Sequence, residues 1–216
     1  GMSVRDDMDK ISTIMGFCPQ HDVLWDHLSG REHLELFARL KNIPEEEIHG
    51  EVEARLKDVK LENAADVRSG RYSGGMQRRL SLAIALLGDP KVIFLDEPTT
   101  GMDPVTRRSV WDCINRAKKG RVIVLTTHSM EEADVLGDKI AILHEGRMRA
   151  LGTSLELKSR FGKGYEISMM LDGDGDEGEK MIRELVAGIL PGGDVMGGSG
   201  NMKIVLPRQT LRHLPP

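Results

Sequence analysis

The spacing of apolar and polar residues predicts two neighbouring helices in the first third of the chain. Ser29 and Glu32 have the spacing of a capping box, which begins the first helix. One face of this helix is then formed by residues at positions i, i+3, i+4 and i+7, namely His33, Leu36, Phe37 and Leu40. Pro44 and an acidic first turn begin the second helix, whose apolar stripe comprises Ile48, Val52, Leu56 and Val59. We therefore expect a small helical insert at about residues 28–72.

After the insert, short apolar strands alternate with helices. The strands are predicted at residues 91–96, 121–127 and 139–144. The intervening helices are predicted from Asp103 to Lys119 and from Ser129 onward. Continuous runs of Val, Ile and Leu joined by helices are typical of an α/β fold with a parallel sheet covered on both faces.

The end of the chain has a pattern of its own. A hairpin is predicted after residue 144, and Thr153 with Glu156 begins another capped helix. Beyond Gly164 the sequence predicts a strand at 165–171, a helix near 179–190 and a hairpin-like ending. We therefore expect one domain at residues 1–163 and a small βαβ-type module at 164–216.

Composition limits the class of protein. Hydrophobic residues make up 39% and charged residues 30% of the 216 positions, as in soluble globular chains. The 30 Lys and Arg against 34 Asp and Glu form no long block of one sign, so charge gives no reason to expect a nucleic-acid partner. No apolar run approaches the ~18 residues of a membrane span. The two cysteines lack metal-site spacing, and no secretory signal opens the chain, so we expect a reducing cytosolic setting.

Two acidic residues follow the strand at 91–96. Asp96 and Glu97 stand at its carboxyl end, where open α/β sheets place ligand chemistry. In nucleotide hydrolysis one such carboxylate can hold Mg²⁺, while a second orients or deprotonates the attacking water. The alternative is that both residues merely end the strand before Pro98.

Three more positions have the chemistry of a phosphate site. Ser73, Gly74 and Gly75 precede a long apolar helix, so the N–H groups of its first turn can face an anion. A simple N-cap explains Ser73 but not two glycines, which allow close approach to the backbone. Gln20 and His128 fall at the ends of two other strands, although a lone histidine there is more often structural.

In this order, Gln20, SGGMQ, LDEP, GMDP and His128 resemble the Q-loop, signature, Walker B, D-loop and switch histidine of the ATP-binding cassette (ABC) ATPases. The wording around these motifs looks most like the A subfamily, whose members move lipids. The resemblance covers roughly residues 12–164. It implies a P-loop NTPase fold, with a parallel-sheet core and a helical subdomain, followed by a small regulatory domain of βαβ type.

The resemblance also implies roles for individual residues and two cofactors, ATP and Mg²⁺. Asp96 would belong to the magnesium shell, and Gln20 would contact Mg²⁺ and sense the membrane domain. Glu97 would be the general base, and His128 would contact the γ-phosphate. The signature would close over ATP held by a second cassette, with Asp103 at the dimer seam; its residues are Ser73, Gly74, Gly75 and Gln77.

One element of the family pattern is missing from the printed sequence. No run matches G-x-x-x-x-G-K-[ST], the P-loop that cradles the phosphates of ATP, and only 19 residues precede Gln20. The chain thus looks like a cassette without its front end, inactive by itself and an ATPase as part of a full transporter. That transporter would place it at the cytoplasmic face of a membrane, against transmembrane domains met through the Q-loop region around Trp25 and Leu28. Equally, those two side chains could simply pack beneath the insert.

Two alternatives remain open from the sequence. A signature-only partner would complete the ATP site of another cassette without hydrolysing ATP itself. A soluble ABC ATPase would predict long coiled-coil insertions or a second cassette, and the sequence has neither.

Overall fold

The computed structural model describes residues 1–162, 165–170, 175–189, 194–198 and 201–206. The chain divides into two compact units, Gly1–Asp138 and Lys139–Pro216. The predicted boundary between residues 163 and 164 lies outside the described residues.

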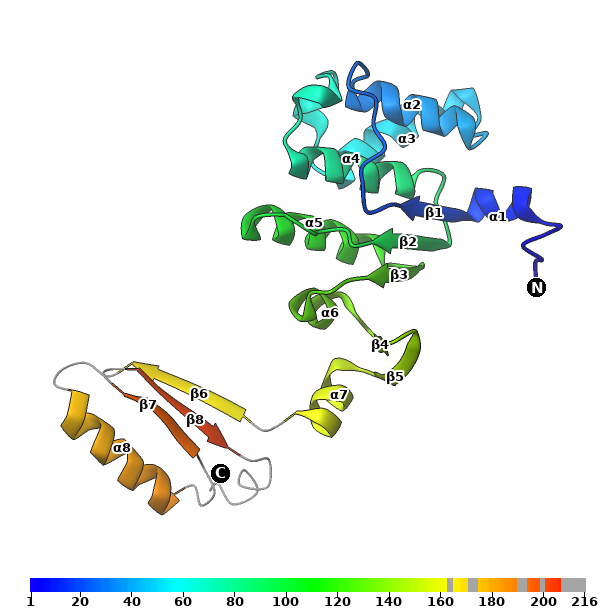
Figure 1. The fold of residues 1–216 in the computed structure, drawn as a ribbon. Coiled ribbons are helices and arrows are strands. Elements are labelled where there is room, and N and C mark those ends of the chain that lie inside the picture. The colour runs from blue at the N-terminus through cyan, green and yellow to red at the C-terminus, as the bar shows by residue number, and fades with distance from the viewer. Residues whose placement is uncertain (163–164, 171–174, 190–193, 199–200, 207–216) are drawn as a thin grey trace. The chain divides into compact units, whose positions relative to one another are not determined.

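The first unit is built on a three-stranded parallel sheet (Figure 1). After the short helix α1 (Met8–Ile14), the strands are β1 (Met15–Cys18), β2 (Val92–Asp96) and β3 (Val122–Thr126), side by side in that order. The register aligns Phe17 with Phe94 and Phe94 with Val124. The carboxyl ends of all three strands therefore lie at one edge of the sheet, as predicted for Asp96 and its neighbours.

Helices α4 (Gly74–Leu86) and α5 (Pro104–Ala117) form a core with one face of this sheet. Inward side chains such as Ile93 and Leu95 are buried there beside Leu82 and Ile114. On the opposite face, four apolar side chains are exposed among the described residues, namely Phe17, Phe94, Val122 and Val124. Within the first unit, the described helices pack on one face of the sheet, where the sequence predicted cover on both, because strand composition alone does not show which elements pack on it.

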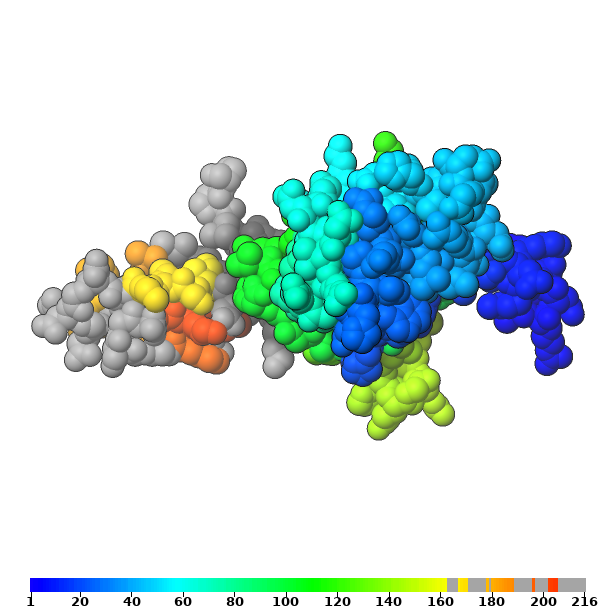
Figure 2. All heavy atoms as spheres, turned by 90° about the horizontal axis from the view of Figure 1, so that it is seen from above, coloured from blue at the N-terminus to red at the C-terminus, as the bar shows by residue number. Residues whose placement is uncertain are grey.

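The predicted helical insert is present. Its helices are α2 (Gly30–Leu40) and α3 (Glu45–Asp58), followed by single turns η1 (Glu62–Ala64) and η2 (Ser69–Arg71). The whole predicted stripe of α3 is buried, whereas in α2 the buried apolar positions are Leu34 and Ala38 and the predicted Leu40 is 65% exposed. These side chains pack with Leu80 and Leu87 of the α4 segment into a second core. Figure 2 shows the insert, coloured blue to cyan, as one closely packed mass.

The second unit begins with a hairpin. Strands β4 (Ile140–His144) and β5 (Arg147–Gly152) pair antiparallel across a turn in which Glu145 and Gly146 have φ values of 51° and 70°. Such a two-residue turn places the next strand alongside in the opposite direction. The prediction that residues 139–144 belong to the parallel sheet is therefore wrong. The first unit ends with α6 (Met130–Leu136), and the hairpin is followed by the capped helix α7 (Ser154–Phe161).

The last elements form a small layer of sheet and helix. They are β6 (Tyr165–Met170), α8 (Gly175–Ile189), β7 (Asp194–Gly198) and β8 (Asn201–Leu206). Strand β8 lies between β6 and β7 and is antiparallel to both, so the predicted βαβ unit has a third strand inserted at its centre. Val186 of α8 packs on Ile204 of β8. None of the described helices is both long enough and apolar enough to span a membrane.

Candidate functional site

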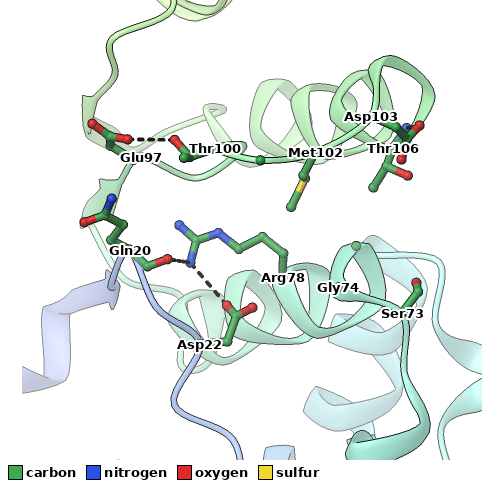
Figure 3. A pocket seen from close by; sticks show the side chains of 12 residues that line it. Gln20, Asp22, Ser73, Gly74, Arg78, Glu97, Thr100, Met102, Asp103 and Thr106 are labelled. Carbon is green, nitrogen blue, oxygen red and sulfur yellow. Dashed lines mark hydrogen bonds and ion pairs between the residues drawn. The ribbon is translucent and has the colours of Figure 1, made fainter.

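A polar cavity of about 380 Å³ lies in the first unit, between the start of α4 and the segment from Glu97 to Thr106 (Figure 3). It contains most of the predicted site residues, namely Gln20, Ser73, Gly74, Gly75, Glu97 and Asp103. A second cavity of about 290 Å³ contains His128. Among the described residues, Asp96 and Gln77 lie outside both linings. The Gln77 side-chain amide instead donates a hydrogen bond to the Ser69 carbonyl at 3.3 Å.

The amino end of α4 faces this cavity. Ser73 is its N-cap, and the Ser73 hydroxyl accepts from the Met76 N–H at 3.3 Å. A Cβ atom on Gly75 would come within 2.2 Å of Thr106 Cγ2, so the close approach of α4 and α5 requires glycine there. A Cβ atom on Gly74 would meet nothing within 4 Å. The chain's own packing therefore does not require Gly74, and the N–H groups of Gly74 and Gly75, unlike that of Met76, remain open to a ligand.

Helix α5 starts across the cavity from Gly74 (Figure 3). Asp103 caps it, since its Oδ1 accepts from the N–H groups of Val105 and Thr106, each at 3.0 Å. Hydrogen bonds from the side chain and backbone of Thr106 hold the pKa of the Asp103 carboxyl below its ordinary value. Asp103 is thus ionised at neutral pH and fixed at the rim of the cavity.

Glu97 and His128 form a pair at the ends of β2 and β3. Glu97 Oε2 accepts the Thr100 hydroxyl at 2.7 Å and lies 2.9 Å from His128 Nδ1. The hydrogen bond from Thr100, followed by that from His128, lowers the pKa of the Glu97 carboxyl. A carboxylate held ionised beside an exposed imidazole can take a proton from a bound water.

Thr126 connects the two acidic residues at the end of β2. Its hydroxyl donates to Asp96 Oδ1 and accepts from the Glu97 N–H at 3.1 Å, while its carbonyl accepts from the same N–H at 3.1 Å. Glu97 has a φ of 43°, in the left-handed region that non-glycine residues seldom occupy. The position of the Glu97 carboxylate therefore depends on contacts made by its backbone.

The donor groups fit the two expected cofactors. Mg²⁺ bound together with phosphates takes only one or two protein oxygens, so the oxygens of Asp96 and Gln20 are sufficient. No three His, Cys, Asp or Glu side chains in the described part of the chain gather as a metal site of their own. The open N–H groups at Gly74 suit a phosphate group.

Arg78 is the main site residue that the sequence did not single out. It lines the larger cavity and is only 4% exposed. Its guanidinium reaches the backbone near both Gln20 and Glu97. The available signal was helical spacing: Arg78 stands four and seven residues before Leu82 and Ala85, on the face of α4 that is buried. A charge on such a face must find partners.

Comparison with known proteins shows which family the chain resembles. The family model described as ABC transporter matches residues 2–100. ABC transporter A family member 2 of Arabidopsis thaliana is 59% identical over 167 residues, which cover 76% of this chain and 17% of that protein. Member 4 from the same plant is 45% identical over 214 residues, covering 98% of this chain and 22% of that protein.

The chain belongs to the ATP-binding cassette family. Within it, the chain is an ABC transporter ATP-binding domain of A-subfamily type, and the predicted P-loop NTPase fold is confirmed. A solved structure entitled "Structure of ATP binding subunit of ABC transporter" matches this ABC domain with a TM-score of 0.64 and 29% identity, covering 75% of this chain and 68% of that one. The chain spans 17% of the length of member 2 and 22% of the length of member 4.

Proposed function

We propose that this ABC domain is the ATP-hydrolysing cassette of a membrane transporter whose substrate is a lipid. One observation carries the proposal: a single polar cavity is surrounded by Gln20, the α4 amino end, Glu97 and Asp103. His128 Nδ1 lies 2.9 Å from the Glu97 carboxylate. The lipid part rests on the A-subfamily likeness. The nucleotide part rests on the site and the family together.

Glu97 acts as the general base in this proposal. Thr100 and His128 fix the Glu97 side chain, and the lowered pKa keeps its carboxylate ionised at neutral pH, the protonation state in which it can accept a hydrogen bond from the attacking water. His128, whose side chain is 69% exposed, is free to reach toward the γ-phosphate. Asp96 and Gln20 would hold Mg²⁺, which would neutralise charge on the phosphates.

The amino end of α4 serves a second cassette. Ser73 and Gly74 present backbone N–H groups and a hydroxyl to ATP held by that partner, with Gln77 behind them and Asp103 at the seam. Transmembrane domains are the other partner. They would contact the loop after Gln20, where Val23 and Trp25 are 63% and 47% exposed, at the cytoplasmic face of the membrane.

We further propose that the 216-residue chain by itself turns over no ATP. Most phosphate donors in P-loop NTPases belong to the P-loop and its lysine, and the printed sequence contains no such motif. Isothermal titration of the purified chain with Mg·ATP should show only weak binding. Micromolar or tighter binding would contradict this part of the proposal.

Substitution of Gly74 by alanine tests the role of the α4 amino end. The added methyl meets no atom of the chain, so Gly74→Ala should fold with unchanged or slightly raised stability. It would, however, stand between the helix N–H groups and the partner's phosphate. We expect the ATPase activity of the complete transporter to fall by about tenfold or more, equivalent to ~1.4 kcal/mol.

Gly50→Ala is the matched control. Gly50 lies inside α3, and a Cβ there also meets nothing within 4 Å, so the change should only stabilise the helix, by ~0.5–1 kcal/mol. Full activity in Gly74→Ala, or an equal loss in Gly50→Ala, would contradict the proposed role.

A further inference from the structure

Arg78 connects two segments of the site that are far apart in the sequence. Its guanidinium lies between the loop that carries Gln20 and the turn that carries Glu97 (Figure 3). We propose that Arg78 is a positioning residue: it holds the backbone on both sides of Glu97 and couples that conformation to the segment 19–22. The inference rests on the proposed role of Glu97 as general base.

Arg78 contacts the turn that carries Glu97. Arg78 Nε donates to the carbonyl of Pro98 at 2.8 Å, and Nη2 donates to the carbonyl of Asp96 at 2.8 Å. These two carbonyls belong to the residues immediately before and after Glu97. One planar group thus fixes the peptide unit directly before Glu97 and the unit that follows Pro98, so it holds the turn on both sides of Glu97.

That direction needs fixing because the Glu97 backbone is strained. Its φ of 43° is a conformation that a β-carbon disfavours and that persists only when surrounding contacts determine it. Thr126 holds the N–H of Glu97, and Arg78 holds the carbonyls that flank it. Without Arg78, the turn would lose two of these contacts and could relax toward an ordinary backbone conformation.

Arg78 also contacts residues 19–22. Arg78 Nη1 donates to the Pro19 carbonyl, to the Gln20 carbonyl at 3.3 Å and to Asp22 Oδ1 at 3.2 Å. Asp22 is the ion-pair partner of the buried guanidinium, and its own side chain is 23% exposed. A shift of this loop therefore changes the partners of the same rigid group that holds the Glu97 turn.

Only arginine has the geometry for this connection. Guanidinium offers five N–H donors in a fixed plane, whereas the lysine ammonium offers three donors from one point. A lysine at position 78 would keep the charge and could satisfy one side of the connection. It could not hold both sides at fixed relative positions.

The first test is the backbone of Glu97 in solution. The ¹³Cα and ¹³Cβ chemical shifts of Glu97, measured by NMR on the 216-residue chain, report whether its φ stays positive. Arg78→Lys should move these shifts toward ordinary values. Arg79→Lys is the matched control, because the neighbouring guanidinium bonds mainly to the carbonyls of Val59 and Lys60 and should leave the Glu97 shifts in place.

The coupling is tested by a second variant that leaves Arg78 intact. Asp22→Asn removes the ion pair with Arg78 and should shift the Glu97 NMR signals when Arg78 is present. In the Arg78→Lys background Asp22→Asn should cause no further shift, because the link between residues 19–22 and the Glu97 turn is already lost. Asp22→Asn also decides the question if Arg78→Lys does not fold. Unchanged Glu97 signals in Asp22→Asn, or equal changes in both backgrounds, would overturn the coupling.

Kinetics of the complete transporter give the functional readout. Arg78→Lys should lower kcat for ATP at least about tenfold, because Glu97 is misplaced. KM for ATP should change less than about twofold, because the residues that bind the nucleotide are unchanged. Arg79→Lys should change neither. If Glu97→Gln leaves ATPase activity intact, the proposed function is wrong. If Glu97→Gln abolishes activity but Arg78→Lys leaves both kcat and the Glu97 chemical shifts unchanged, the proposed function stands and only the positioning role of Arg78 is wrong.

Discussion

At the scale of single residues, the site depends on a few hydroxyl and guanidinium contacts that hold acidic side chains. Thr126 bonds to Asp96 and to the Glu97 backbone, Thr100 bonds to the Glu97 carboxylate, and Arg78 holds the carbonyls on either side. Both carboxylates are thus placed by neighbours that take no part in the proposed chemistry themselves.

Thr126 offers a direct test at this scale. Thr126→Val keeps the shape of the side chain but removes the hydroxyl that bonds to Asp96 and Glu97. Loss of a residue that orients ligands or catalytic groups typically costs 10–100-fold in activity, so we expect a fall of about that size in the ATPase activity of the complete transporter. Thr126→Ser retains the hydroxyl and should stay within about threefold of wild type; equal activity in Val and Ser variants would contradict the assigned role.

The sequence identified the motif residues but not the contacts that hold them. Gln20, Glu97 and His128 were predicted because each stands in a recognisable pattern at a strand end. The partners of Arg78 at Pro19 and Gln20 are 59 and 58 positions away in the chain, so only the folded structure brings them together. The roles proposed for the motif residues remain predictions.

At the scale of elements, the structure confirms the predictions that depend on local sequence. Ser29 and Glu32 form the predicted capping box: the Glu32 N–H donates to Ser29 Oγ at 3.2 Å, and the Ser29 N–H donates to Glu32 Oε2 at 2.7 Å. Thr153 and Glu156 do the same for α7. The predicted hairpin after residue 144 is also present. Pairing between distant strands is not local, which is why the separation of β4 from the parallel sheet and the central position of β8 were not predicted.

The capping box predicts a pH dependence of stability. Hydrogen bonds from the backbone and side chain of Ser29 lower the pKa of the Glu32 carboxyl in the folded state. A lowered folded pKa means that the stabilisation is complete above the unfolded value, about 4.3, and is lost as pH falls through the folded value. Wild type should therefore unfold at higher denaturant concentration than Glu32→Gln at pH 7, and the gap should close in acid. A gap that does not change with pH would contradict this role for the Glu32 charge.

At the scale of the whole molecule, the sequence predicted the fold class, the insert and the family. The α/β core follows from the apolar strand pattern, and the ABC fold follows from the motif order; both are confirmed. The open apolar face at Phe17 and Phe94 could not be predicted, since β-strands covered on one face and on both can share the same residue types. The predicted domain boundary between residues 163 and 164 stays a prediction, because these residues lie outside the described ones.

The central claim is that this domain hydrolyses ATP with Glu97 as the base, and one kinetic comparison tests it most directly. Turnover and binding of Mg·ATP should be measured side by side in the complete transporter and its Glu97→Gln variant. The account predicts that kcat falls by ~10²–10⁴-fold, because the proton acceptor is gone, while the Kd for Mg·ATP stays close to that of wild type. Retained turnover, or a loss of binding as large as the loss of turnover, would contradict it.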